Sequence, residues 1–256
     1  MGEVYRAQHP TLNRAVAIKI LPEHKGGDEA EKRFEREAQT VAKLKHSNIV
    51  TMHDVGEQDG QPYMVMEYID GQDLSDLLRQ RGHLPISEAL PILSDVASAL
   101  DYAHSQGVIH RDIKPSNVMV EKTTTTGATQ GVRAVLMDFG IAKSYVAATR
   151  LTHTGGMIGT LDYISPEQIQ GSAEVDARAD IYSLGVMAYQ VLTGKLPFEH
   201  NNPGAMVLAH LNQPAPDPRE IVSDLPDSAA LVVMRAMSKK PDQRFETAGA
   251  FVAAMG

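Results

Sequence analysis

Short runs of β-branched and apolar residues dominate the first third of the chain. Such runs, bounded by Pro, Asn, Asp and Gly, are typical of strands joined by tight turns. We therefore expect strands at 4–7, 15–20, 49–57 and 63–68. Between the second and the third of them, residues 28–45 carry apolar side chains at helical spacing and acidic residues near the start, which predicts one helix.

From residue 71 onward the spacing of apolar residues becomes helical. Helices are expected at 74–81, 86–105, 179–193, 205–211, 228–237 and 247–255. Gly194 follows the third of these and is a typical helix stop. The threonine-rich stretch 123–131 predicts a solvated loop insertion, and its extra length fits the tip of a β-hairpin. The expected fold class is α+β, with a small antiparallel β-rich lobe (1–68) before a larger α-rich lobe (69–256).

Composition adds no element to this picture, but it excludes several kinds of partner and site. The 256 residues include 24 Lys and Arg against 32 Asp and Glu, a formal net charge of −8, which argues against nucleic acid as a partner. The absence of cysteine excludes disulfides, thiolate metal sites and a cysteine nucleophile. No apolar run reaches the roughly 18 residues of a membrane-spanning helix, and the first residues do not have the pattern of a signal peptide.

The strongest chemical signal is the run His-Arg-Asp-Ile-Lys-Pro-Ser-Asn at 110–117. After it comes Asp-Phe-Gly at 138–140, which directly follows a strand-like apolar stretch. Upstream, Lys19 ends a predicted strand and Glu37 lies on the predicted helix that follows. A strand Lys, a helix Glu, H-R-D-x-K-x-x-N and D-F-G, in this order, are the parts of the protein-kinase signature.

With these motifs the chain resembles the bacterial Hanks-type (eukaryotic-like) serine/threonine protein kinases, and the likeness runs in matching order from Gly2 to Met255. It includes Val-Met-Glu-Tyr at 65–68, Gly-Thr at 159–160, Ser-Pro-Glu at 165–167, Asp-Ile-Tyr-Ser-Leu-Gly at 180–185 and Pro-Asp-Gln-Arg-Phe at 241–245. The resemblance implies the bilobal kinase fold as one kinase domain over 1–256. It also implies transfer of the γ-phosphate of ATP to Ser or Thr hydroxyls of proteins, with autophosphorylation of the activation loop.

The resemblance assigns the chemistry to a few side chains. Asp112 is expected to accept or orient the proton of the acceptor hydroxyl, and Lys114 to neutralise the γ-phosphate. Lys19 is expected to hold the α- and β-phosphates, oriented by an ion pair with Glu37. Asn117 and Asp138 would bind Mg²⁺, for which Mn²⁺ could substitute.

Nucleotide binding follows by the same resemblance. The carbonyl of Glu67 and the N–H of Ile69 would hydrogen-bond the adenine, and Met66 would guard the pocket behind them. The remaining residues expected to contact ATP, beside Lys19 and Asp138, are Gly2, Val4, Ala17 and Met119.

Other matching residues point to regulation and architecture. Arg111 would bind a phosphorylated activation loop, whose expected phosphosites are Thr152 and Thr154. Thr160 is expected to hydrogen-bond the catalytic Asp and Lys. Thr160 and four other positions would be structural. The four others are His110 beneath Phe139, the pair Glu167 and Arg244, and Asp180 as the anchor of the catalytic-loop backbone.

The chain departs from the family at its start, because a complete glycine-rich loop reads G-x-G-x-x-G-x-V and this sequence opens at the last glycine, Gly2. We therefore expect a first strand to be missing from 1–68, and with it some affinity for ATP and some stability.

Two other functions stay open on the sequence alone: a catalytically dead nucleotide-binding module, and a small-molecule kinase of related fold. The expected partners are protein substrates, and a homodimer through the β-rich lobe is an analogy only. The expected location is cytoplasmic, or the cytoplasmic part of a longer membrane-anchored kinase.

Overall fold

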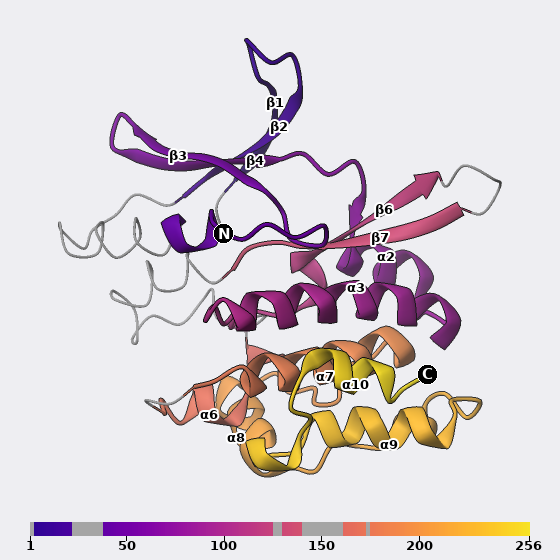
Figure 1. Cartoon of the computed structure of the whole chain (residues 1–256). Coiled ribbons are helices and arrows are strands. Elements are labelled where there is room, and N and C mark those ends of the chain that lie inside the picture. Colours follow the sequence, from indigo (N-terminus) through magenta and orange to yellow (C-terminus); the bar gives the residue numbers. More distant parts are fainter. Residues whose placement is uncertain (1–2, 22–37, 125–129, 140–160, 173–174) are drawn as a thin grey trace.

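The computed structural model describes residues 3–21, 38–124, 130–139, 161–172 and 175–256. A four-stranded antiparallel sheet lies at one end of the molecule and most of the helices at the other (Figure 1). The sheet has the order β1-β2-β4-β3, formed by β1 (Val4–Gln8), β2 (Ala15–Ile20), β4 (Gln61–Glu67) and β3 (Met52–Gln58). This arrangement confirms the expected α+β class with two lobes.

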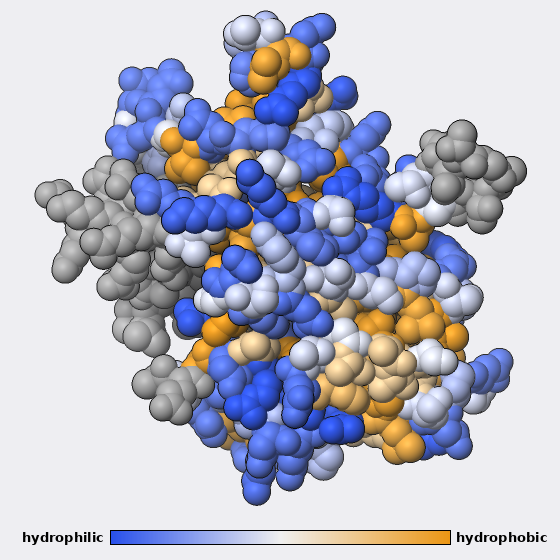
Figure 2. All heavy atoms as spheres, in the orientation of Figure 1, coloured by the Kyte–Doolittle hydropathy of each residue, from blue (hydrophilic) through white to orange (hydrophobic). Residues whose placement is uncertain are grey.

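Strand register decides which residues of the sheet share a face. Directly opposite residues of antiparallel strands lie on the same face, and Ala17 pairs with Met66 while Lys19 pairs with Val4 on one side and Met64 on the other. On this face the two residues opposite Lys19 are apolar, whereas Ala17 lies opposite Arg6 of β1. At the outer edge of the sheet β1 is exposed, with Val4 at 59% and Tyr5 at 52%, and Figure 2 shows apolar atoms at the tip of the β1–β2 hairpin.

A second sheet connects the two lobes. It has the order β5-β6-β7, formed by β5 (Gln72–Asp73), β6 (Val118–Thr124) and β7 (Gln130–Leu136). The strand expected at 49–57 begins only at Met52, because the residues before it pair with β7 instead. The Val50 N–H donates to the Leu136 carbonyl at 3.0 Å, and the Leu136 N–H donates to the Asn48 carbonyl at 2.8 Å.

The expected loop at 123–131 was too long, because β6 and β7 continue into it as a hairpin with Thr123 opposite Gly131. β-branched threonines pair well across antiparallel strands, and the pairing agrees with the hairpin tip expected for this insert. The helix expected at 28–45 ends early, since the described part is helical only from 38 to 41 and its first ten residues lie outside the described ranges.

The helical lobe is built around α7 (Arg178–Thr193), of whose sixteen residues fourteen are buried. It begins after Ala177 and ends at Gly194, whose φ of 75° is the left-handed conformation expected of a helix stop. The helices packed against α7 are α3 (Ile86–Ser105), α6 (Pro166–Ile169), α9 (Asp227–Ala236) and α10 (Ala248–Ala253). α8 (Pro203–Asn212) packs against α6, and α2 (Leu74–Arg81) packs against β5 and β6. Three 3₁₀ turns complete the described elements: η1 (Pro115–Asn117), η2 (Pro218–Glu220) and η3 (Pro241–Gln243).

Close packing between α7 and α9 depends on a glycine. A Cβ added at Gly185 would lie 2.8 Å from the Cβ of Ala236 and 3.2 Å from Cγ of Met237. α7 is therefore closely packed in the middle of the lobe, and its first turn carries Asp180, which reaches the candidate site.

Candidate active site

The run 110–117 lies between α3 and β6, and a buried carboxylate of α7 holds its first residues. Asp180, 1% exposed, accepts the N–H of His110 at 2.8 Å and the N–H of Arg111 at 2.7 Å, and the Nε2 of His104 lies 2.8 Å from it. Arg111 has a φ of 64°, an unfavourable left-handed conformation for a residue with a side chain. The contacts with Asp180 place this strained residue directly before Asp112.

Three side chains of this run meet around Asp112. The Lys114 ammonium lies 3.0 Å from Asp112 Oδ2, and the Asn117 side-chain amide donates to the same oxygen at 3.1 Å and to the Asp112 carbonyl at 2.7 Å. Because Nδ2 of Asn117 donates to Asp112, Oδ1 of the same side chain points away from Asp112. Asn117 is 5% exposed, so its conformation is well determined by its surroundings.

Lys19 and Asp138 meet across the two lobes. The Lys19 ammonium, from β2, lies 2.6 Å from Asp138 Oδ2, with side-chain exposures of 11% and 29%. Asp138 follows β7 with a φ of 56°. The sequence analysis did not anticipate this pair, because it expected Glu37 as the partner of Lys19, and Glu37 lies outside the described residues.

His110 is fully buried and links the two acidic residues through the backbone. Its ring lies 4.6 Å from the ring of Phe139, centroid to centroid. Nδ1 accepts the N–H of Asp112 at 3.2 Å, and Nε2 lies 2.8 Å from the carbonyl of Met137. With Nδ1 as acceptor, Nε2 carries the proton and donates to Met137. Burial lowers the pKa of His110, which keeps the ring neutral.

An apolar cluster lies beside these polar groups. Met66 and Ile69 are buried together with Val50 and Val135. Ala17, Met119 and Met137 pack against them. The expected adenine-contacting residues Ala17, Met66, Ile69 and Met119 thus gather in one place, next to Glu67 at the end of β4, whereas Val4 lies at the exposed edge of the sheet.

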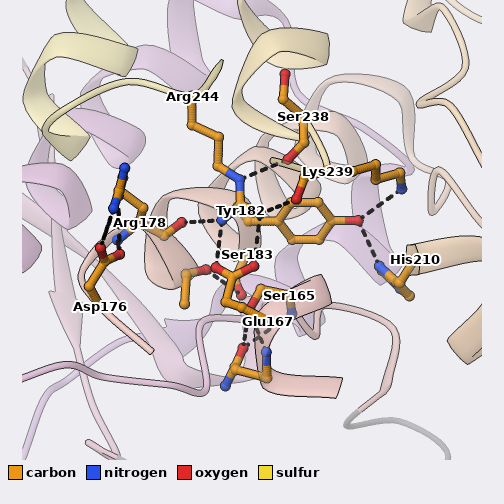
Figure 3. A network of polar contacts seen from close by, with 12 residues as sticks. Ser165, Glu167, Asp176, Arg178, Tyr182, Ser183, His210, Ser238, Lys239 and Arg244 are labelled. Carbon is orange, nitrogen blue, oxygen red and sulfur yellow. Dashed lines mark hydrogen bonds and ion pairs between the residues drawn. The ribbon is translucent and has the colours of Figure 1, made fainter. Parts of the chain in front are cut away.

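Glu167 and Arg244 form a buried, bidentate ion pair below this site (Figure 3). The Arg244 Nη1 and Nη2 groups donate to the two carboxylate oxygens at 2.6 and 2.9 Å. The remaining N–H groups donate to the carbonyls of Arg178, Ser238 and Lys239 at 2.7 to 3.2 Å. All five donors of the guanidinium are therefore used, and the pair fixes α6 onto the helical lobe.

A second polar cluster, which the sequence analysis missed, extends from this pair. The Tyr182 hydroxyl lies 2.9 Å from Nδ1 of His210 and 3.4 Å from the Lys239 ammonium, which also donates to the Ala209 carbonyl at 3.2 Å (Figure 3). Burial lowers the pKa of Lys239 to about 8 and that of His210 to about 4. Helical periodicity marks Tyr182 and His210 only as core, and Lys239 lies in the loop after α9, so no sequence signal identified the cluster.

Five of the expected site residues lie outside the described ranges: Gly2, Glu37, Thr152, Thr154 and Thr160. Their roles stay predictions.

The oxygen donors that could hold a divalent cation are few. Within the described ranges no group of three or more His, Cys, Asp or Glu side chains gathers as a metal site. Asp138 and the amide of Asn117 supply hard oxygens, and two such ligands suit Mg²⁺, which retains water molecules and shares phosphate oxygens. The donor set therefore fits Mg²⁺ bound together with a phosphate-bearing substrate.

The sequence matches the family described as protein kinase domain over residues 1–253. The chain belongs to the protein kinase family. Similar curated proteins are the serine/threonine-protein kinases PksC of Streptomyces coelicolor (44% identical, 98% of this chain, 45% of that protein), PknB of Mycobacterium leprae (39%, 97%, 39%) and PrkC of Bacillus subtilis (37%, 97%, 37%).

The kinase domain thus spans between about a third and a half of the length of these relatives. Among its described helices, none combines the length and the apolar character needed to cross a membrane.

Proposed function

We propose that this chain catalyses transfer of the γ-phosphate of ATP to Ser and Thr hydroxyls of proteins, its own activation loop included. The observation that carries the proposal is the joint placement of two groups of side chains. Asp112, Lys114 and Asn117 contact one another, and Lys19 and Asp138 pair across the lobes at 2.6 Å. The relatives, which are named serine/threonine-protein kinases, support the same reaction.

In this reaction the oxygen of the acceptor hydroxyl forms a bond to the γ-phosphorus, and the bond from that phosphorus to the β,γ-bridging oxygen breaks to release ADP. Asp112 receives or orients the hydroxyl proton, while Lys114 offsets negative charge on the transferred group. Lys19 holds the α- and β-phosphates. Asn117 and Asp138 would hold Mg²⁺, which neutralises phosphate charge when it is bound.

ATP binding is assigned to the apolar cluster and its neighbours. Ala17 and Met119 would contact the faces of the adenine, and Met66 would close the pocket behind it. The carbonyl of Glu67 and the N–H of Ile69 would read its edge. Mn²⁺ would replace Mg²⁺ because it accepts the same oxygen ligands.

Control of the reaction is assigned to Arg111, whose exposed guanidinium would bind phosphate on Thr152 or Thr154. Dimerisation through the sheet and a cytoplasmic location belong to the same proposal.

A small-molecule kinase is the less favoured function. The buried pair Glu167–Arg244 holds α6 beside the catalytic run, and Gln168 of α6 contacts Arg111. A platform of this kind serves a protein acceptor, whereas a small acceptor would not need it.

The test is incubation of the purified chain with ATP and Mg²⁺, followed by mass spectrometry of its phosphosites and of a Ser/Thr-rich acceptor protein. We expect phosphate on Thr152 or Thr154 and on the acceptor, and its loss in Asp112→Asn. Asp224→Asn is the matched control, because Asp224 is exposed and remote from the site. ATP binding without any transfer would contradict the proposal and indicate a nucleotide-binding module.

A further inference from the structure

We propose that Gln168 of α6 is a positioning residue for Asp112, acting through the peptide group that joins Arg111 to Asp112. The inference rests on the proposed kinase function. The decisive contact is a hydrogen bond from the side-chain Nε2 of Gln168 to the carbonyl oxygen of Arg111, 3.2 Å long, between residues 57 positions apart.

The peptide group in question is held at both of its polar atoms. Its carbonyl accepts from Gln168, and its N–H, which belongs to Asp112, donates to Nδ1 of His110 at 3.2 Å. Nε2 of His110 in turn donates to the Met137 carbonyl at 2.8 Å. One line of hydrogen bonds therefore runs from α6 through the backbone before Asp112 to the residue before Asp138.

Neighbours on the other side fix the orientation of the Gln168 amide. Its Oε1 accepts the N–H of Ser165 at 3.1 Å and the hydroxyl of Ser165 at 2.9 Å, as part of a capping box that begins α6. An N–H donor must face the amide oxygen, so the NH₂ group must face Arg111. Gln168 thus couples the first turn of α6 to the catalytic run with no freedom to flip.

The hydrogen bond from Gln168 to the Arg111 carbonyl helps to stabilise an unfavourable backbone conformation. Arg111 has a φ of 64°, and a non-glycine residue keeps such a conformation only where its surroundings hold it. Asp180 holds the N–H of Arg111 at 2.7 Å, and Gln168 holds the carbonyl on the far side of the same residue. Rotation of this peptide group would swing the Asp112 carboxylate away from Lys114 and Asn117.

The test is a change of one polar group, Gln168→Glu. A carboxylate still accepts from Ser165 and favours the helix N-terminus, so α6 keeps its cap. Its second oxygen, when ionised, cannot donate to the Arg111 carbonyl. With a protein acceptor at pH 8 we expect kcat to fall about ten-fold or more, because a carbonyl acceptor loses its donor, while KM for ATP stays within about two-fold. A melting temperature close to that of the wild type shows that the fold is intact.

The split between kcat and KM separates positioning from mere damage. Gln168→Met, which also has no donor, should lose kcat as Gln168→Glu does, again with little change in KM for ATP. Gln170→Glu adds the same charge on an exposed neighbour and should keep the wild-type kcat.

Two outcomes would overturn the inference: wild-type kcat in both Gln168 variants, or a loss of kcat in Gln168→Glu that comes with a lowered melting temperature or a raised KM for ATP. The wild-type chain is assayed in parallel, and an inactive wild type would count against the proposed function instead.

Discussion

His210 shows how burial converts a common residue into a pH-dependent element of stability. It is 0% exposed, and within the described structure its Nε2 makes no hydrogen bond, while Nδ1 faces the Tyr182 hydroxyl. Tyr182 accepts from Lys239, so its own proton points at His210, and the imidazole is the neutral tautomer with the proton on Nε2. Burial first, and the Lys239 ammonium second, lower the pKa of His210 to about 4.

We predict that this histidine makes the protein less stable as the pH falls from about 6.5 to about 4. In that window the unfolded chain binds a proton at His210 and the native chain does not, so the free energy of unfolding falls by up to about 1.4 kcal/mol per pH unit. His210→Asn keeps an acceptor for Tyr182 but does not titrate. Urea denaturation at several pH values should show a shallower slope for this variant. His200→Asn, at an exposed position, should keep the wild-type slope, and equal slopes in all three proteins would refute the prediction.

At the scale of elements, α6 is too short to be stable by itself and depends on tertiary contacts. It has four residues, and its Glu167 is joined to Arg244, which follows η3 and lies 77 positions later. The Arg244 side chain is 0% exposed and that of Glu167 10%. A buried charge without its partner lowers the free energy of unfolding. A single substitution in this pair should therefore have a large effect on stability.

We predict that Glu167→Ala lowers the free energy of unfolding by about 3–5 kcal/mol, since it leaves the Arg244 guanidinium buried without a counter-charge. Equilibrium urea denaturation measures this directly. The double variant Glu167→Ala with Arg244→Met should lose less than the sum of the two single variants. Breaking the exposed bidentate pair Arg81–Glu88 by Glu88→Ala is the matched control and should leave the denaturation midpoint nearly unchanged. Additive losses in the double variant would argue against a coupled pair.

The elements also show what a sequence can predict. Long helices such as α3 and α7 lie almost where periodicity placed them, because their apolar faces determine them locally. The strand before Met52 was misplaced because Asn48 and Val50 pair with the end of β7, far along the chain, and no local pattern contains that pairing. The motif residues Asp112 and Asp138 could be selected by spacing alone, whereas Gln168 becomes visible only when α6 packs against the catalytic run.

At the scale of the whole molecule, one ion pair connects the four-stranded sheet with the residues that follow β7. It joins Lys19, on a strand of the sheet, to Asp138 in the proposed cation site. In the proposed function Lys19 binds the phosphates of ATP and Asp138 binds Mg²⁺. Binding of ATP and Mg²⁺ would therefore compete with the ion pair between these two side chains. The bound nucleotide would then add to the backbone pairing of Asn48 and Val50 with Leu136, which already joins the lobes.

We predict that ATP with Mg²⁺ raises the melting temperature. At a ligand concentration about 100 times Kd the native state gains about 2.7 kcal/mol, which corresponds to roughly 5–10 °C for a chain of this size. Asp138→Asn should bind ATP with a shift that no longer depends on Mg²⁺, because a carboxylate ligand is gone.

Lys19→Met should lose most of the shift with or without Mg²⁺, because the phosphates lose their cation. Differential scanning fluorimetry with ATP alone, Mg²⁺ alone and both together separates these cases, with Asp224→Asn as the control that should keep the full shift. If Lys19→Met and Asp138→Asn both respond to ATP and Mg²⁺ as the wild type does, the nucleotide binds elsewhere, and the pair at 2.6 Å serves only to hold the lobes together.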